Sequence, residues 1–138
     1  MDKKDLQKKY VQLYLVREQL KAMAEEKSAI EAKLNEFLVS VEAISKLEGV
    51  KAGEEIWSPL GSGIFVRSGI KDTENVLVSI GAGIVVKRPG KDALEILKAR
   101  LEELVNIDTQ LTAEMEKLKH QGDSLEKQLE ELADKSRT

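Results

Sequence analysis

The single histidine, His120, is the first candidate for catalysis or metal binding in this sequence. It falls on a charged helical stretch, and no nearby pattern supplies the partners that a catalytic triad or a metal site needs. The absence of cysteine removes thiolate nucleophiles, disulfides and cysteine-based zinc sites. The sequence has 25 acidic residues, and most of them are distributed along helix faces, which is typical of solubilising and pairing charges. We therefore expect no catalytic residue and no metal site.

Three glycine-containing segments have residue types found in phosphate-binding loops, but each departs from the pattern. The segment that ends at residues 89–92 has Val85 where the first glycine of a P-loop belongs, and Asp92 replaces the hydroxyl residue that holds magnesium. Residues 61–63 and 81–83 lack the third glycine of a dinucleotide fingerprint and precede strands rather than helices. We expect no nucleotide, no other cofactor and no enzymatic activity.

Composition excludes several classes of partner. The formal net charge is -3, so no basic surplus points to nucleic acid. No apolar run approaches the roughly 20 residues of a membrane span, and the N-terminus leads into a charged stretch rather than an apolar signal core. The expectation is a soluble, cytoplasmic protein that binds neither nucleic acid nor membranes.

Two long segments share a seven-residue rhythm that is typical of coiled coils. The first, within a predicted N-terminal coiled-coil helix at residues 1–48, combines two series of seam positions: Leu6, Leu13, Leu20, Lys27, Leu34, Val41 and Val16, Met23, Ile30, Phe37, Ile44. The second, within a predicted C-terminal helix at residues 93–138, has these: Leu94, Leu97, Leu101, Leu104, Asp108, Leu111, Met115, Leu118, Gly122, Leu125, Leu129, Leu132. A capping box from Asp92 to Glu95 predicts that this helix begins at about Ala93.

The similar lengths of these helices predict an antiparallel coiled coil within one chain, with pairing between chains as the alternative. Three seam positions break the apolar pattern. Lys27 and Asp108 fall at similar heights and could pair, but we favour Lys27 reaching solvent, with Asp108 at the solvated edge. Gly122 is interpreted as a kink or a place of looser pairing.

Between the helices, at residues 49–92, the period changes to two. Residues 54–60, 63–70, 75–80 and 83–88 predict four strands in two glycine-turned hairpins, with Pro59 placing the first strand at an edge or a bulge. Such hairpins bury too little to be stable alone, so we expect them to mediate oligomerisation. The residues predicted for that contact are Ile64, Phe65, Val66, Val76, Leu77, Val78, Ile84, Val85 and Val86.

The hairpin segment PLGSGIFVRSGIKDTENVLVSIGAGIVVKR, residues 59–88, resembles the signature of the α-class prefoldin subunit, in its archaeal type. The implied fold class is α+β: a long antiparallel two-helix coiled coil with two β-hairpins inserted between the helices, the hairpins forming an oligomeric β-barrel. β-class subunits have a single hairpin. The family implies a hexamer of two α-type and four β-type subunits that captures unfolded or nascent proteins without ATP and delivers them to a group II chaperonin. Trp57 and Gly122 are departures from the family.

The stretch YVQLYLV, residues 10–16, contains more apolar residues than a coiled-coil seam needs. We predict that the excess forms a client-binding surface at the tip of the coiled coil, the end farthest from the hairpins; an ordinary core or a neighbouring helix is the alternative. The predicted client-binding residues are Leu6, Tyr10, Val11, Leu13, Tyr14, Leu15, Leu125, Leu129 and Leu132. A coiled-coil scaffold or adaptor that binds one folded partner, or a filament-forming prefoldin-like protein, would show much of the same sequence pattern.

Overall fold

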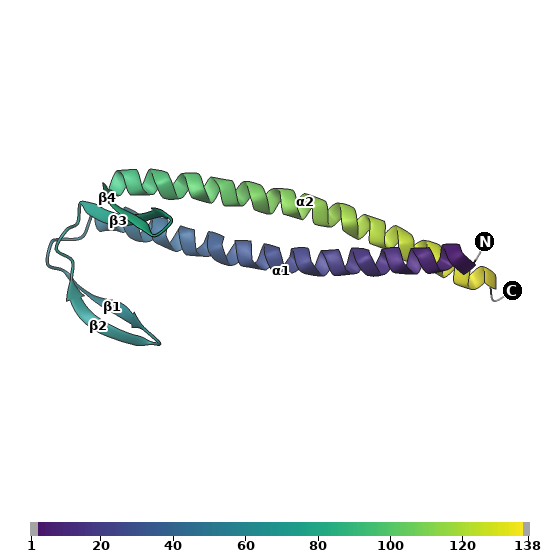
Figure 1. Cartoon of the computed structure of the whole chain (residues 1–138). Helices are drawn as coiled ribbons and strands as arrows, with labels where there is room; N and C mark the ends of the chain where they lie inside the picture. Colours follow the sequence, from purple (N-terminus) through teal and green to yellow (C-terminus); the bar gives the residue numbers. More distant parts are fainter. Residues whose placement is uncertain (1–2, 137–138) are drawn as a thin grey trace. The chain divides into compact units, whose positions relative to one another are not determined.

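Two long helices with two antiparallel hairpins between them make up the computed structural model, which describes residues 3–136 (Figure 1). In chain order the elements are α1 (Lys3–Leu47), β1 (Glu55–Gly61), β2 (Ile64–Gly69), β3 (Asn75–Gly81), β4 (Ile84–Pro89) and α2 (Gly90–Ser136). The predicted arrangement of helix, two hairpins and helix is confirmed. Among these described residues, no helix is both long and apolar enough to cross a membrane.

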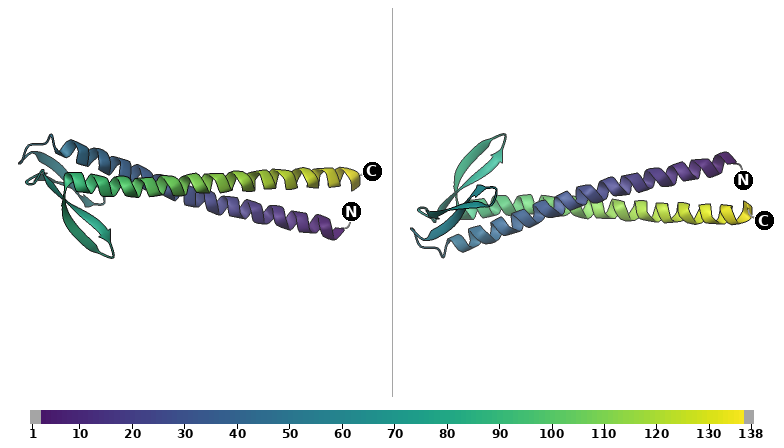
Figure 2. Two further views of the ribbon diagram at one scale, coloured as in Figure 1. Left: turned by 90° about the horizontal axis from the view of Figure 1, so that it is seen from above. Right: turned by 90° about the horizontal axis from the view of Figure 1, so that it is seen from below.

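The chain divides into two compact units, which are described separately. The helical unit comprises Met1–Leu34 and Leu104–Thr138, and the hairpin unit comprises Asn35–Glu103. Within the helical unit, the N-terminal part of α1 lies beside the C-terminal part of α2, as both views in Figure 2 show. Its core consists of Leu13, Val16, Leu125 and Leu129, with Leu6, Leu20 and Leu118 packed against it. These are seam positions of both helices, so pairing within the chain is confirmed.

Gly122 lies inside this core and packs closely, which contradicts the prediction of looser pairing. The residue is buried, and a Cβ atom built on it would lie 3.3 Å from Val16 Cγ1 and 4.0 Å from Leu13 Cδ1. A larger residue here would meet these side chains, so glycine lets α1 approach the backbone of α2. Gly122 therefore marks a close approach of the two helices.

A polar layer interrupts the seam of the helical unit where Lys27 and Asp108 meet. Lys27 Nζ lies 3.0 Å from Asp108 Oδ1 and donates to Thr112 Oγ1 at 2.7 Å. The hydrogen bond from Lys27 to Asp108 is the main cause that raises the pKa of the Lys27 ammonium group, opposed by desolvation. The favoured prediction that Lys27 extends to solvent is wrong, because the register of the helices places a carboxylate and a hydroxyl within its reach.

In the hairpin unit, β1 pairs with β2 and β3 pairs with β4, as two separate two-stranded sheets. Each turn has two central residues with positive φ, as a type I′ turn requires. They are Ser62 (51°) and Gly63 (78°) in the first hairpin, and Ala82 (52°) and Gly83 (74°) in the second. β1 is an edge strand of its two-stranded sheet, as predicted from Pro59. The register of β1 shifts between Pro59 and Gly61, and that of β3 shifts in the same way between Ser79 and Gly81, so this irregularity does not depend on the proline.

Helix α2 begins at Gly90, earlier than the predicted start at about Ala93. Gly90 N donates to Glu74 O at 2.9 Å, so the first residue of the helix is tied to the segment before β3. Asp92 lies within the first turn rather than at the N-cap, where its carboxylate still interacts favourably with the helix dipole. The prediction of Asp92 as the capping residue is therefore wrong.

Candidate functional site

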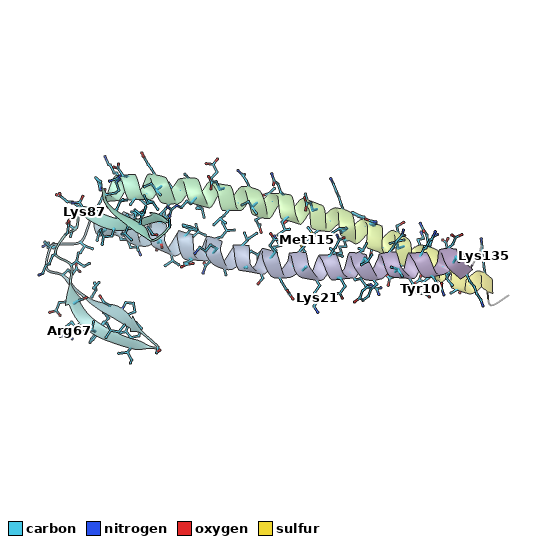
Figure 3. All side chains as sticks on the ribbon, viewed as in Figure 1. Tyr10, Lys21, Arg67, Lys87, Met115 and Lys135 are labelled. Atoms are coloured by element: carbon cyan, nitrogen blue, oxygen red, sulfur yellow. The ribbon has the colours of Figure 1, made fainter. Side chains whose placement is uncertain are left out.

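Four apolar residues of α1 are exposed in the helical unit, close to where α1 begins. They are Tyr10, Val11, Tyr14 and Leu15, each more than half exposed. Figure 3 shows Tyr10 on this part of α1, near Lys135 of α2. We call this end of the helical unit, where α1 begins and α2 ends, the tip. Because the seam uses only every third or fourth residue, the consecutive apolar residues of this stretch leave some side chains outside the core.

The other predicted client-binding residues lie in or beside the core. Leu13, Leu125 and Leu129 are buried, and Leu6 and Leu132 are half-buried. The predicted set therefore separates into surface residues, which an incoming chain can contact directly, and seam residues that support them.

A groove between the helices runs along one side of the tip, and we call it the tyrosine groove. It is lined by Tyr10, Leu13, Tyr14 and Arg17 of α1 and by Glu126, Leu129, Glu130 and Ala133 of α2. Arg17 Nη2 and Glu126 Oε1 form an ion pair of 3.0 Å across it. Leu13 and Leu129 are buried, whereas the tyrosines are exposed, so the groove has an apolar base between aromatic and charged walls.

A second surface of the tip lies on α1 alone and has a different character. A shallow pocket there is lined by Lys4, Gln7, Lys8, Val11 and Gln12. The two lysines make this surface cationic beside the apolar side chain of Val11. We call it the lysine surface.

The predicted oligomerisation residues are divided unequally between exposed and buried positions in the hairpin unit. Ile64, Phe65, Val66, Leu77, Ile84 and Val85 are exposed, Val76 and Val86 are half-buried, and Val78 is buried. Ile56, Leu60 and Ile80 are further exposed apolar residues of the strands that the sequence analysis did not select. The same strand periodicity could have identified Ile56 and Ile80. Both hairpins thus present apolar side chains to solvent.

The second hairpin is attached to α2 in a way that the first is not. Arg100 Nη2 donates to the carbonyl oxygen of Ser79 at 2.8 Å, and Val78 of the same strand is buried. By contrast, the described residues of β1 and β2 include none that is buried. The first hairpin is therefore stabilised little by packing against the rest of the chain, and it leaves more of its apolar surface exposed than the second hairpin does.

Aromatic and charged side chains pair across the first hairpin. The Arg67 guanidinium carbon lies 5.1 Å from the centre of the Trp57 ring, and Arg67 Nε lies 3.6 Å from Glu55 Oε2. Trp57 and Arg67 are cross-strand partners, so their pairing follows from the register. Trp57 stands out in the sequence, but its contact with Arg67 was not predicted, because it depends on which residues of the two strands face one another.

The residues considered for chemistry are not brought together. His120 is exposed on α2. Among residues 3–136 there is no group of three or more histidine, cysteine, aspartate or glutamate residues that could hold a metal ion.

Comparisons with known proteins agree with this architecture. The prefoldin subunit family model matches residues 16–135. A chain of filamentous PFD from Methanocaldococcus jannaschii, known by cryo-electron microscopy, is similar with a TM-score of 0.73 and 18% identity, over 83% of this chain and 94% of that chain. The prefoldin beta subunit from Thermococcus strain KS-1 gives a TM-score of 0.61 and 18% identity, over 93% of this chain and 91% of that chain. No curated protein matches the sequence.

At these identities the two structures show a shared fold, whereas the family assignment comes from the match along most of the sequence. The prefoldin family consists of non-enzymatic chaperone subunits that form oligomers with other prefoldin subunits. The chain belongs to the prefoldin family.

Proposed function

We propose that this chain is an archaeal-type α-class subunit of a prefoldin hexamer, a holdase that captures unfolded or nascent proteins without ATP. Two hairpins between the helices support the α-class assignment, since β-class subunits are expected to have one. In this proposal two α-type and four β-type subunits assemble in the cytoplasm and deliver clients to a group II chaperonin. Residues 1–48 and 93–138 form the client-holding coiled coil, and residues 49–92 form the assembly module.

The exposure of Tyr10, Val11, Tyr14 and Leu15 is the observation that carries the holdase proposal. Water-exposed apolar side chains gathered at one end of a helical pair lose little by contacting another apolar chain and gain the free energy of burying their surface. Binding through several subunits at once would raise the overall affinity. No bond-making step is required, and the chain acts by binding rather than as an enzyme.

Assembly is proposed to occur through the hairpins. Ile64, Phe65 and Val66 on the first hairpin and Leu77, Ile84 and Val85 on the second expose apolar surface, beside strand edges without a neighbour in the described chain. Strands of other subunits would pair with these edges and close the apolar residues into a β-barrel.

A pair of matched variants tests the client-binding surface in the assembly co-expressed with β-type subunits. The tip variant replaces Val11, Tyr14 and Leu15 with serine. The control replaces three other exposed apolar helix residues with serine: Leu38, Val39 and Val105. Suppression of aggregation is measured by the light scattering of a denatured protein that is diluted into buffer with and without ATP. The mass of the assembly is measured separately, by light scattering coupled to gel filtration.

We expect the tip variant to assemble but to lose suppression, and the control variant to keep both. Suppression by the parent assembly should be the same with and without ATP. Equal suppression by the two variants would contradict the proposed surface. An assembly that binds one folded partner but no denatured protein would instead indicate an adaptor, and an open series of increasing masses would indicate a filament.

A further inference from the structure

The tip of the helical unit has two surfaces with opposite charge, and their geometry assigns a preference among client segments. In the tyrosine groove, the carboxylates Glu126 and Glu130 lie one helical turn apart on α2. Glu126 is paired with Arg17 at 3.0 Å, whereas Glu130 forms no ion pair with any described residue. Two carboxylates and one guanidinium leave the groove with one uncompensated negative charge.

The tyrosines of the groove add to this preference for positive charge. Tyr10 and Tyr14 are four residues apart on α1, so they lie on the same face of the helix, and both are more than half exposed. The faces of aromatic rings carry partial negative charge and attract ammonium and guanidinium groups within about 6 Å. An incoming lysine or arginine can place its aliphatic part on a tyrosine ring and its charge towards Glu130.

The lysine surface disfavours client segments that carry positive charge. Lys4 and Lys8 lie beside Val11 on the same pocket, so an apolar segment that carries lysine or arginine meets like charges there. A basic segment is therefore directed to the tyrosine groove rather than distributed over the tip.

We propose that the tyrosine groove binds segments of non-native protein in which apolar residues are flanked by lysine or arginine. The apolar residues would pack on Leu13 and Leu129 between the tyrosines, and the flanking cation would pair with Glu130. This inference rests on the proposed holdase function and specifies which client segments one of its surfaces takes.

Three peptides with the same central leucine and phenylalanine residues test the inference. They differ only in the residues at their ends, which are lysine, glutamine or glutamate. Their binding to the full chain, assembled with β-type subunits, is measured by competition against a fluorescent peptide at low salt. We expect the lysine peptide to bind tightest and the glutamate peptide weakest, with the difference decreasing as salt is added.

Matched variants locate the preference within the tip. Glu130→Gln should weaken the lysine peptide by about two- to fivefold, the range of an exposed ion pair, and leave the glutamine peptide unchanged. Glu131→Gln makes the same charge change at the adjacent exposed position outside the groove and should have no such effect. Arg17→Gln frees Glu126 and should tighten the lysine peptide.

The outcomes separate this inference from the function on which it rests. If all three peptides bind with equal affinity, or if Glu131→Gln acts like Glu130→Gln, then the charge preference of the groove is refuted while the holdase proposal stands. If no peptide competes and the assembly does not suppress aggregation, both are refuted.

Discussion

Replacing Gly122 with alanine tests whether this residue is a point of close helix approach. Alanine in a helix interior is about 1 kcal/mol more favourable than glycine, so an unconstrained site would be stabilised by that amount. Here the new Cβ lies 3.3 Å from Val16 Cγ1, a distance at which the valine must shift. Crowding in a packed core costs roughly 1 to 3 kcal/mol. The contact is short by only a few tenths of an ångström, so we take the lower value. The gain in helix propensity and the cost of crowding then cancel to within about 0.5 kcal/mol.

A double-mutant cycle separates these two effects. In the Val16→Ala background the crowding methyl group is gone, so Gly122→Ala should raise the free energy of unfolding by about 1 kcal/mol. In the Val11→Ala background the deleted side chain is exposed, and Gly122→Ala should behave as it does in the parent. Urea unfolding followed by far-ultraviolet circular dichroism, at one protein concentration, measures all six chains.

The coupling energy between Gly122→Ala and Val16→Ala is therefore expected to be about 1 kcal/mol. A stabilisation of about 1 kcal/mol in all three backgrounds would refute the close approach, since it would show that the alanine methyl group meets nothing.

Three further predictions concern the polar layer and the second hairpin. Because the pKa of Lys27 is raised above its ordinary value of 10.5, the charged ammonium group stabilises the fold fully below pH 10.5, and this stabilisation is lost as the pH rises through the higher pKa of the folded chain. Lys27→Gln should remove this alkaline dependence from the urea midpoints. Hydrogen bonds, chiefly from the backbone amide of Asn75, lower the pKa of Asp72 below 3.8; its contribution is present above 3.8 and is lost as the pH falls through the lower folded value. The protection of the Asn75 amide against hydrogen exchange, measured relative to its intrinsic rate at each pH, should accordingly fall in acid, and Asp72→Ala should lack this protection at every pH. Ala82→Asn should stabilise the second hairpin by about 0.5 to 1 kcal/mol, because asparagine tolerates the positive φ of 52° better than alanine does; slower hydrogen exchange in β3 and β4 would show it, and unchanged exchange would contradict it.

The elements of the fold were predictable because they depend on local patterns. A seven-residue rhythm identifies both seams, and burial of Leu13, Val16, Leu125 and Leu129 follows it. The glycine-containing turns at residues 61–63 and 81–83, each between runs of β-branched residues, identify the hairpins. These signals lie within short windows of sequence, so they do not require knowledge of which distant residues meet.

What could not be predicted depends on register and on interhelical distance. Lys27 bonds to Asp108 because the helices align them to 3.0 Å, and a shift of one turn would separate them. A glycine in a seam can loosen or tighten a helix pair, and only the position of Val16 shows that Gly122 does the latter. At the candidate site, the excess of apolar residues predicted the exposed surface of α1. The carboxylate of Glu130 in the tyrosine groove was missed, since that groove exists only once α2 is placed beside α1.

The distance along the chain between the two halves of the seam has a consequence for biosynthesis. Arg17 and Glu126, which face each other across the tip, are separated by 109 residues. At roughly 5 to 20 residues per second, a ribosome needs about 5 to 20 seconds to translate that interval. Leu13 and Val16 therefore emerge long before Leu125 and Leu129 can cover them. A nascent subunit therefore passes through a stage in which apolar residues of α1 are exposed without the residues of α2 that cover them in the folded chain.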